Sequence, residues 1–300
     1  MTSVIVVPPS VDDGTFEQIL AQLAALPADA RVLLDARHAR WASPYGLTAL
    51  LTLAQTREAM PALAVPEHED TKGYWARTGF FEHAAELFEL HGQVPRARAA
   101  GESQVLLEIT PITQTGDVHG VVSRIQERSA AILQGQLKLD AKSTMGFSLT
   151  LSEACQNIVE HAGRGGWVAV QAYNWQKRLG RHVVQIAVCD AGMGFRQSLE
   201  QAPNRRRSER WDDGMALEDA VLRKVSRFRD PGRGQGLAGI RKYVALWDAK
   251  LSIRSGTARI VASVPSWDDD APLTEKLPPF PGAQMQITIP ERITDRMAAK

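Results

Sequence analysis

The stretch LTLSEACQNIVEHA at residues 149–162 decides how this chain is interpreted, because it repeats polar residues at a helical spacing. Glu153, Asn157 and His161 follow one another four residues apart. Each step of four turns an α-helix by about 400°, so the three residues drift by only about 40° per step and share one face. The opposite face carries apolar residues that would pack on a sheet, namely Leu149, Leu151, Cys155, Ile158 and Val159.

The carboxylate and the amide on the polar face suit a site for a metal ion bound to phosphates. Mg²⁺ prefers oxygen ligands and bridges substrate phosphates, and Asn157 offers a neutral carbonyl oxygen. Glu153 has the chemistry to orient or deprotonate an attacking water or hydroxyl group. Taken alone, the same pattern is also that of a solvated polar face, and this alternative stays open.

A second stretch, VCDAGMGF at residues 188–195, places an acidic residue at the end of an expected strand. The Asp190 carboxylate can accept a hydrogen bond from the amino group of adenine. Gly192 and Gly194 lack a Cβ atom, which lets the backbone approach a flat base. A tight turn after a strand would show the same residues.

The third stretch, GRGQGLAGI at residues 232–240, comes directly before an expected helix. Its glycines Gly232, Gly234 and Gly236 permit a loop whose amides point at phosphates, and the helix N-terminus adds a favourable partial charge. No strand directly precedes the loop, so it is not a Rossmann fingerprint. A flexible connector is the alternative for this loop alone.

In combination, the three stretches resemble the motifs of the GHKL ATPase superfamily, which includes gyrase, MutL and the histidine kinases and shares the Bergerat fold. The first stretch looks like its N box, and the other two look like its glycine boxes. The resemblance implies that the chain binds ATP and Mg²⁺, with Glu153 catalytic and Asn157 on the metal. It implies a nucleotide site formed by Asn157, His161, Asp190, Gly192, Gly194, Gly232, Arg233, Gly234, Gly236 and Leu237.

Within that superfamily, SEACQNIVEHA is most similar to the N box of anti-sigma-factor serine kinases. PGAQMQITIP at 281–290 looks like the closing strand, although Ala283 stands where threonine is usual. The resemblance covers residues 110–292 and implies a four- or five-stranded mixed sheet backed by helices. Residues 195–231 would be the ATP lid, in which Arg229 could contact phosphates.

The first part of the chain has the periodicity of a small α/β unit. We expect strands over 3–7 and 31–36, helices over 15–26, 43–60 and 74–90, and a loop marked by Pro61 and Pro66. RVLLDARHARWASPYGLTALLTLAQ resembles an STAS domain, the fold of anti-anti-sigma factors. Pro44 stands where regulatory members carry a phosphorylatable serine, and Ser43 is expected to cap a helix instead.

The second part is expected to begin with a strand near Gln104. Helices follow over 116–135 and 141–162, then two paired strands over 167–175 and 182–190, a helix from Gly236, and strands from Lys250, Arg259 and Ala283. A linker is expected over 94–103. The predicted fold is therefore α/β, an α+β two-layer sandwich. Its expected parts are an STAS-like domain over 1–94 and an ATP-binding domain over 104–292.

Composition narrows the class of protein further. The net charge of +1 gives no electrostatic case for nucleic acid or an anionic membrane. No stretch approaches the roughly 20 apolar residues of a membrane-spanning helix, and MTSVIVVPPS lacks the features of a signal peptide. The two cysteines, Cys155 and Cys189, are expected to be buried thiols. These features predict a cytoplasmic protein.

Three hypotheses on function follow. The first is an enzyme that hydrolyses ATP or phosphorylates serine or threonine on a regulatory protein partner of the sigma-factor or STAS type. The second is a non-catalytic switch in which nucleotide binding controls partner binding by the STAS-like domain. The third, DNA repair in the MutL manner, is disfavoured by the near-neutral charge. The superfamily often dimerises, so a homodimer is also an expectation.

Overall fold

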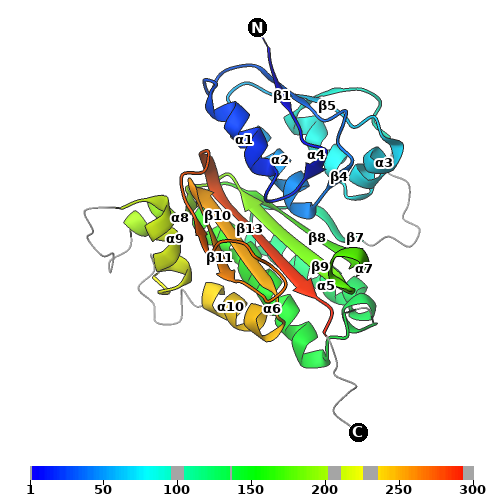
Figure 1. Ribbon diagram of the computed structural model, residues 1–300, viewed down its shortest axis with the longest axis vertical. Helices are drawn as coiled ribbons and strands as arrows, with labels where there is room; N and C mark the ends of the chain where they lie inside the picture. Colours follow the sequence, from blue (N-terminus) through cyan, green and yellow to red (C-terminus); the bar gives the residue numbers. More distant parts are fainter. Residues whose placement is uncertain (1, 96–104, 136, 202–210, 226–235, 293–300) are drawn as a thin grey trace.

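The computed structural model describes residues 2–95, 105–135, 137–201, 211–225 and 236–292. It arranges them in layers (Figure 1): N-terminal elements, a large sheet, and helices on the far side of that sheet. This architecture confirms the predicted α/β class, with a sheet backed by helices. Among the described residues, no helix is long and apolar enough to cross a membrane.

The N-terminal unit, residues 2–95, contains a parallel four-stranded sheet in the order β1-β3-β5-β6 and a small pair, β2-β4. Its strands are β1 (Ser3–Val6), β2 (Ser10–Val11), β3 (Val32–Asp35), β4 (Trp41–Ala42), β5 (Ala62–Ala64) and β6 (Glu89–His91). Its helices are α1 (Phe16–Ala24), α2 (Pro44–Gln55), α3 (Glu69–Arg77) and α4 (Phe80–Leu87). The apolar stripe predicted for α1 is confirmed, since Phe16, Ile19, Leu20 and Leu23 are buried.

Two expectations for this unit are wrong. The expected loop between Pro61 and Pro66 contains β5, because both prolines flank the strand and neither interrupts its pairing with β3 and β6. The expected single helix over 74–90 is broken after Thr78. Gly79 adopts the left-handed conformation, with a φ of 77°, which ends α3 and starts α4.

The second part is built on a seven-stranded sheet in the order β12-β11-β10-β13-β9-β8-β7. Its strands are β7 (Val105–Ile112), β8 (Gly166–Trp175), β9 (Arg181–Asp190), β10 (Lys250–Gly256), β11 (Ala258–Ser263), β12 (Leu273–Thr274) and β13 (Phe280–Pro290). Every described pairing in it is antiparallel, where a mixed sheet of four or five strands was expected. The short strand β12 and the bulged strand β7 extend the sheet at its two edges.

The helices of this part are α5 (Thr115–Gly135), α6 (Ala141–Asn157), α7 (Gln176–Leu179), α8 (Gly194–Glu200), α9 (Asp213–Val221) and α10 (Gly236–Leu246), with a π-helical turn, η1 (Ile158–Ala162). Helices α5, α6 and α10 cover one face of the sheet (Figure 1). One large core lies between them, with Phe147, Leu151, Val168, Ile186 and Ile287 inside it. Most of the expected linker over 94–103 lies outside the described residues.

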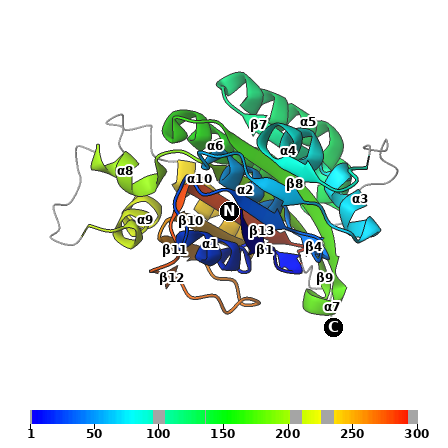
Figure 2. The same ribbon diagram turned by 90° about the horizontal axis from the view of Figure 1, so that it is seen from above.

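The N-terminal unit covers the other face of the sheet, as the view from above shows (Figure 2). Helix α2 is buried from Pro44 to Ala54 and packs on β8, β9 and β13. Hydrogen bonds cross the boundary from Thr48 Oγ1 to Cys189 Sγ at 3.2 Å and from Trp167 Nε1 to Gln55 Oε1 at 3.0 Å. Both cysteines are buried and free, as the sequence predicts. The two parts therefore share an interior.

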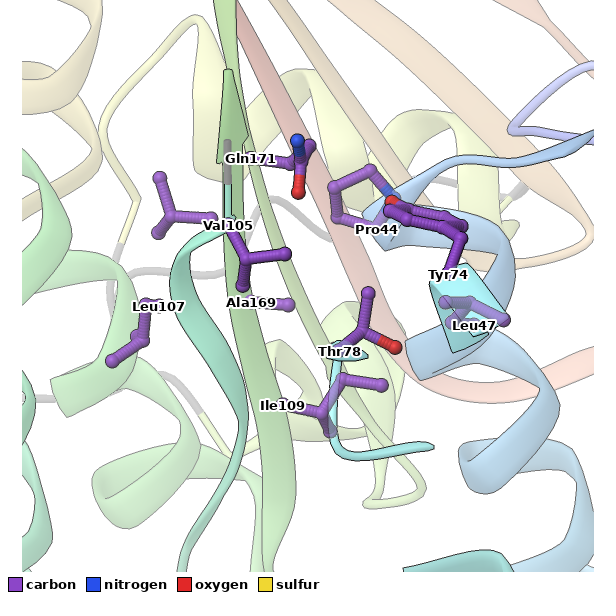
Figure 3. Close-up of a pocket in the computed structure, with 10 residues that line it drawn as sticks. Pro44, Leu47, Tyr74, Thr78, Val105, Leu107, Ile109, Ala169 and Gln171 are labelled. Atoms are coloured by element: carbon purple, nitrogen blue, oxygen red, sulfur yellow. The ribbon is translucent and has the colours of Figure 1, made fainter. Parts of the chain in front are cut away.

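A small crevice at this boundary shows how closely the parts pack (Figure 3). It has a volume of about 10 Å³, room for roughly one water molecule. Pro44, Leu47 and Tyr74 line it on one side and Val105, Ala169 and Gln171 on the other. The carbonyl oxygen Oε1 of Gln171 has no hydrogen-bond partner among the described residues.

Candidate nucleotide site

Helix α6 presents Glu153 and Asn157 beside each other. It begins at Asp140, whose carboxylate accepts the Ser143 amide at 2.7 Å and caps the helix. The four-residue step places Glu153 and Asn157 on one side, where Glu153 is exposed and Asn157 half-buried. Leu151, Cys155 and Ile158 pack in the core as predicted. Leu149 does not, since its side chain is 44% exposed.

His161 lies beyond the α-helical part of this segment. The chain changes to the π-helical turn η1 directly after Asn157, and His161 belongs to that turn. A π-helix bonds residue i to i+5, so the α-helical spacing argument holds for Glu153 and Asn157 but does not extend to His161. Single π-helical turns within α-helices are frequent at functional sites.

Gly236 brings the third sequence motif against α6. It begins α10, and a Cβ atom there would lie 2.6 Å from Glu153 Oε2 and 4.0 Å from Asn157 Oδ1. The helix is held in place by Ile240 and Val244, which are fully buried. Leu237 packs against the same core while half-buried. The N-terminus of α10 therefore lies beside the carboxylate and the amide.

Part of the glycine-rich motif and of the expected lid falls outside the residues that the structure describes. Gly232, Arg233, Gly234 and Arg229 lie outside the described residues, as does much of the expected lid over 195–231. Its described parts are α8 and α9. Helix α9 is anchored through Asp213, whose Oδ2 accepts the backbone amide and the hydroxyl of Thr257, both at 2.8 Å.

Asp190 ends β9 as a buried carboxylate with two backbone donors. Its Oδ1 accepts the Gly192 amide at 2.8 Å and the Ala283 amide at 3.3 Å. The residue is only 8% exposed. Burial raises the pKa of Asp190 to about 6, and the two amide hydrogen bonds lower it in part. At neutral pH the carboxylate is ionised and able to accept further hydrogen bonds.

Gly192 joins this turn to the π-helical turn. A Cβ atom at Gly192 would lie 2.1 Å from the carbonyl oxygen of Ala162, the last residue of η1. The next amide, that of Met193, donates to the same oxygen at 3.3 Å. Gly194 has a φ of 69° and stands against Ser255 Oγ. Glycine at position 192 therefore lets the Asp190 turn approach the end of η1, and glycine at position 194 lets it approach Ser255 and Gly282.

Three further residues complete this region, and none of them was among the predicted site residues. Gly282 has a φ of 81° and lies against the Asp190 backbone, and Ser255 Oγ accepts the Phe195 amide at 3.1 Å and donates to the Gly282 carbonyl at 2.8 Å. Ala283 contributes its backbone amide, which any residue except proline would supply. In the sequence, the Pro-Gly pair at 281–282 was the feature that could have indicated a turn at this position.

The electrostatics differ between the two carboxylates. Desolvation raises the pKa of Glu153, and the nearby negative charge of Glu160 raises it further. Among the described residues, no group of three or more His, Cys, Asp and Glu side chains is placed to hold a metal ion.

Residues 120–254 match the family model of the histidine kinase-like ATPase domain. The matched segment runs from α5 to β10 and contains Glu153, Asn157, Asp190 and Gly236. No curated protein and no solved structure matches the chain. The segment 120–254 is a histidine kinase-like ATPase domain of the GHKL type.

Proposed function

We propose that this chain is a regulatory protein that binds Mg·ATP and either hydrolyses it or phosphorylates serine or threonine on a protein partner. The family match supports ATP binding. One observation carries the proposal: Glu153 and Asn157 face the start of α10 at Gly236, while Asp190 is held nearby by the amides of Gly192 and Ala283.

Asp190 is the proposed adenine reader. Both of its backbone donors bond Oδ1, which leaves Oδ2 to accept the amino group of the base. Gly192 and Gly194 would let the base lie close to the backbone. Gly232, Arg233, Gly234 and Gly236 would surround the phosphates at the helix N-terminus, where backbone amides favour anions. Leu237 and His161 would complete the nucleotide site.

Asn157 fits the role of metal ligand. Its amide nitrogen Nδ2 is buried and has no hydrogen-bond partner among the described residues, and Oδ1 lies 4.0 Å from the position of a Cβ atom at Gly236. Mg²⁺, when bound, would neutralise charge on the phosphates. Glu153 would then accept the proton of the attacking water or hydroxyl. Its raised pKa makes it a stronger base than an ordinary glutamate, and the base form increases as the pH rises.

We also propose that residues 1–94 form an STAS-like domain and residues 104–292 the ATP-binding domain. Ser43 is fully buried, and its hydroxyl accepts the Gly46 amide at 3.0 Å, which confirms its capping role. It lies beneath the sheet, on the face opposite α6. A phosphoryl acceptor is therefore sought on a separate regulatory protein, of the sigma-factor or STAS type.

The alternative function is a nucleotide-dependent switch without catalysis. It is favoured by the packing of the N-terminal unit directly beneath the end of β9, where Thr48 bonds Cys189 next to Asp190. In this case nucleotide binding would alter how the STAS-like domain binds its partner.

Replacing Glu153 by alanine distinguishes the two functions. For the enzyme, we expect ATP turnover to fall by about 100-fold or more, because the base is removed, while the dissociation constant for ATP changes little. Turnover is measured as phosphate release or as transfer to a partner. Glu127→Ala is the matched control, since it removes an exposed carboxylate from the neighbouring helix α5. Equal turnover in Glu153→Ala and wild type would exclude the proposed base.

ATP affinity is expected to depend on the ionisation of Asp190. The ionised carboxylate accepts the adenine amino group, and its pKa in the free protein is about 6. Affinity should therefore be constant above about pH 7 and fall as the pH drops through 6, approaching a tenfold loss for each further pH unit. The measurement is ATP titration between pH 5 and pH 8. Affinity that stays unchanged across this range would contradict the role of Asp190.

A further inference from the structure

The beginning of β13 connects the nucleotide site to the N-terminal unit. Residues 280–284, called here the β13 bulge, contain a register shift against β10, where Ser255 pairs with Ala283 but Gly256 pairs with Phe280. Bulges re-aim side chains and are common next to functional sites. This one brings Gly282 so close to Asp190 that a Cβ atom would lie 2.0 Å from the Asp190 carbonyl oxygen.

One side of the β13 bulge fixes Asp190. The Ala283 amide donates to the Asp190 carboxylate, and the Gln284 side-chain amide donates to the Asp190 carbonyl at 3.2 Å. Gln284 is fully buried and also donates to Pro281 at 2.9 Å. The position of the carboxylate therefore follows the position of the bulge.

The other side of the β13 bulge is held by helix α1. Phe280 packs on Phe16 with ring centroids 5.6 Å apart, and both side chains are fully buried. The guanidinium of Arg254, which is in register with Gln284, lies 5.4 Å from the centre of the Phe280 ring. It forms a bidentate ion pair with Glu17 of α1, at 2.7 and 3.1 Å.

The ion pair between Glu17 and Arg254 links α1 rigidly to the strands beside the β13 bulge. The Arg254 side chain is 1% exposed and that of Glu17 17% exposed. Arg254 also donates to the carbonyl oxygens of Gly256 and Pro278, which flank the bulge. A buried, bidentate and fully bonded pair holds a fixed geometry, whereas loss of one partner leaves an uncompensated charge.

We propose that the N-terminal unit controls ATP affinity in cis, with Glu17 and Arg254 acting as positioning residues for the Asp190 carboxylate. The inference rests on the proposed role of Asp190 as the adenine reader. Helix α1 holds Arg254 and Phe280, these hold the β13 bulge, and the bulge presents Asp190 to the base. Because coupling between sites is reciprocal, ATP also tightens the packing of α1 on the sheet.

The first test compares a ligand that contains adenine with one that does not. ATP would contact Asp190, whereas inorganic tripolyphosphate would bind at the phosphate loop alone. In Glu17→Gln we expect the dissociation constant for ATP to rise about tenfold, with that for tripolyphosphate unchanged. If Glu17→Asp recovers part of the ATP affinity that Glu17→Gln loses, the negative charge at position 17 contributes in addition to packing.

Tyr74→Phe is the matched control. The Tyr74 hydroxyl bonds that of Tyr173 at 3.2 Å, so this variant also removes a hydrogen bond between the two parts. Tyr173 lies seven residues along β8 from Gly166, which pairs with Asp190, a separation of about 23 Å. We expect both dissociation constants to stay at wild-type values in Tyr74→Phe.

The second measurement needs no variant. ATP should slow hydrogen exchange of the backbone amides of α1 in the wild-type protein, while tripolyphosphate should not. Equal losses for both ligands in Glu17→Gln, or α1 exchange that ATP leaves unchanged, would overturn the coupling but leave the nucleotide site intact. A wild-type protein that binds tripolyphosphate and ATP equally, or neither, would overturn the role of Asp190 and the coupling with it.

Discussion

Asp190→Asn is expected to raise the free energy of unfolding at pH 7 and to weaken ATP binding by at least about 100-fold. The folded protein raises the pKa of Asp190 from 3.8 to about 6, so the folded state binds the proton more tightly than the unfolded state does. Keeping this carboxylate ionised at pH 7 therefore costs the fold about 2 to 3 kcal/mol. Asparagine removes that cost and retains an oxygen for the amides of Gly192 and Ala283.

The gain in stability of Asp190→Asn over wild type should shrink as the pH falls. As the pH falls from 6 toward 4, wild-type Asp190 becomes protonated and its cost disappears, so the two proteins should converge. Chemical denaturation at pH 7 and pH 4.5 measures this. Asp140→Asn is the control with the opposite sign, because hydrogen bonding to Ser143 lowers the pKa of Asp140. An Asp190→Asn protein that is less stable than wild type at pH 7 would contradict the account.

ATP binding is weakened for a separate reason. The asparagine amide group would present N–H donors to the adenine amino group, which is itself a donor. We expect the dissociation constant to rise by at least about 100-fold, as for a buried hydrogen-bonding site left unpaired. A gain in stability together with a loss of binding would mark Asp190 as a residue kept for function.

Gly282→Ala is expected to cause the largest loss of stability among glycine substitutions in this region. Its φ of 81° is strained for any residue with a side chain, and the added methyl group would lie 2.0 Å from the Asp190 carbonyl oxygen. The obstruction is backbone, so it cannot rotate away. We expect the free energy of unfolding to fall by about 3 kcal/mol or more, with weaker ATP binding because the β13 bulge must shift.

Gly180→Ala separates the two causes. Gly180 has a φ of 68°, yet a Cβ atom there would meet nothing within 4 Å. The free energy of unfolding of Gly180→Ala should fall only by the cost of the left-handed conformation, about 1 kcal/mol. This variant should bind ATP normally. Thermal and urea unfolding of both variants provide the comparison. Similar losses in the two proteins would show that close approach at Gly282 is unimportant.

Local patterns in the sequence predicted the parts of the site that depend on neighbouring residues. Glu153 and Asn157 come together because they are one helical turn apart, and Asp190 with Gly192 because a turn follows a strand. Their approach to Gly236 followed from family resemblance and not from the pattern itself. His161 shows the limit of periodicity, since the π-helical turn that changes its spacing has no sequence signature.

Long-range packing was not predictable in the same way. Glu17 and Arg254 are 237 residues apart, and no local pattern pairs a charged residue on an amphipathic helix with one on a strand. The sequence of α2 has no charged residue and is mostly apolar, which indicates a helix buried on several sides, yet it does not identify the sheet that covers the helix. Leu149 was misplaced because α6 is covered by α5, α10 and the sheet together, and its exposed strip is set by all three.

The most direct test of the central claim is calorimetric titration of the wild-type protein with ATP, with and without Mg²⁺, beside GTP as a control. We predict saturable binding of one ATP per chain that Mg²⁺ strengthens, with GTP binding much more weakly because Asp190 accepts from the adenine amino group. Absence of ATP binding, or equal binding of ATP and GTP, would contradict the assignment of Asp190, Asn157 and Gly236 to a nucleotide site.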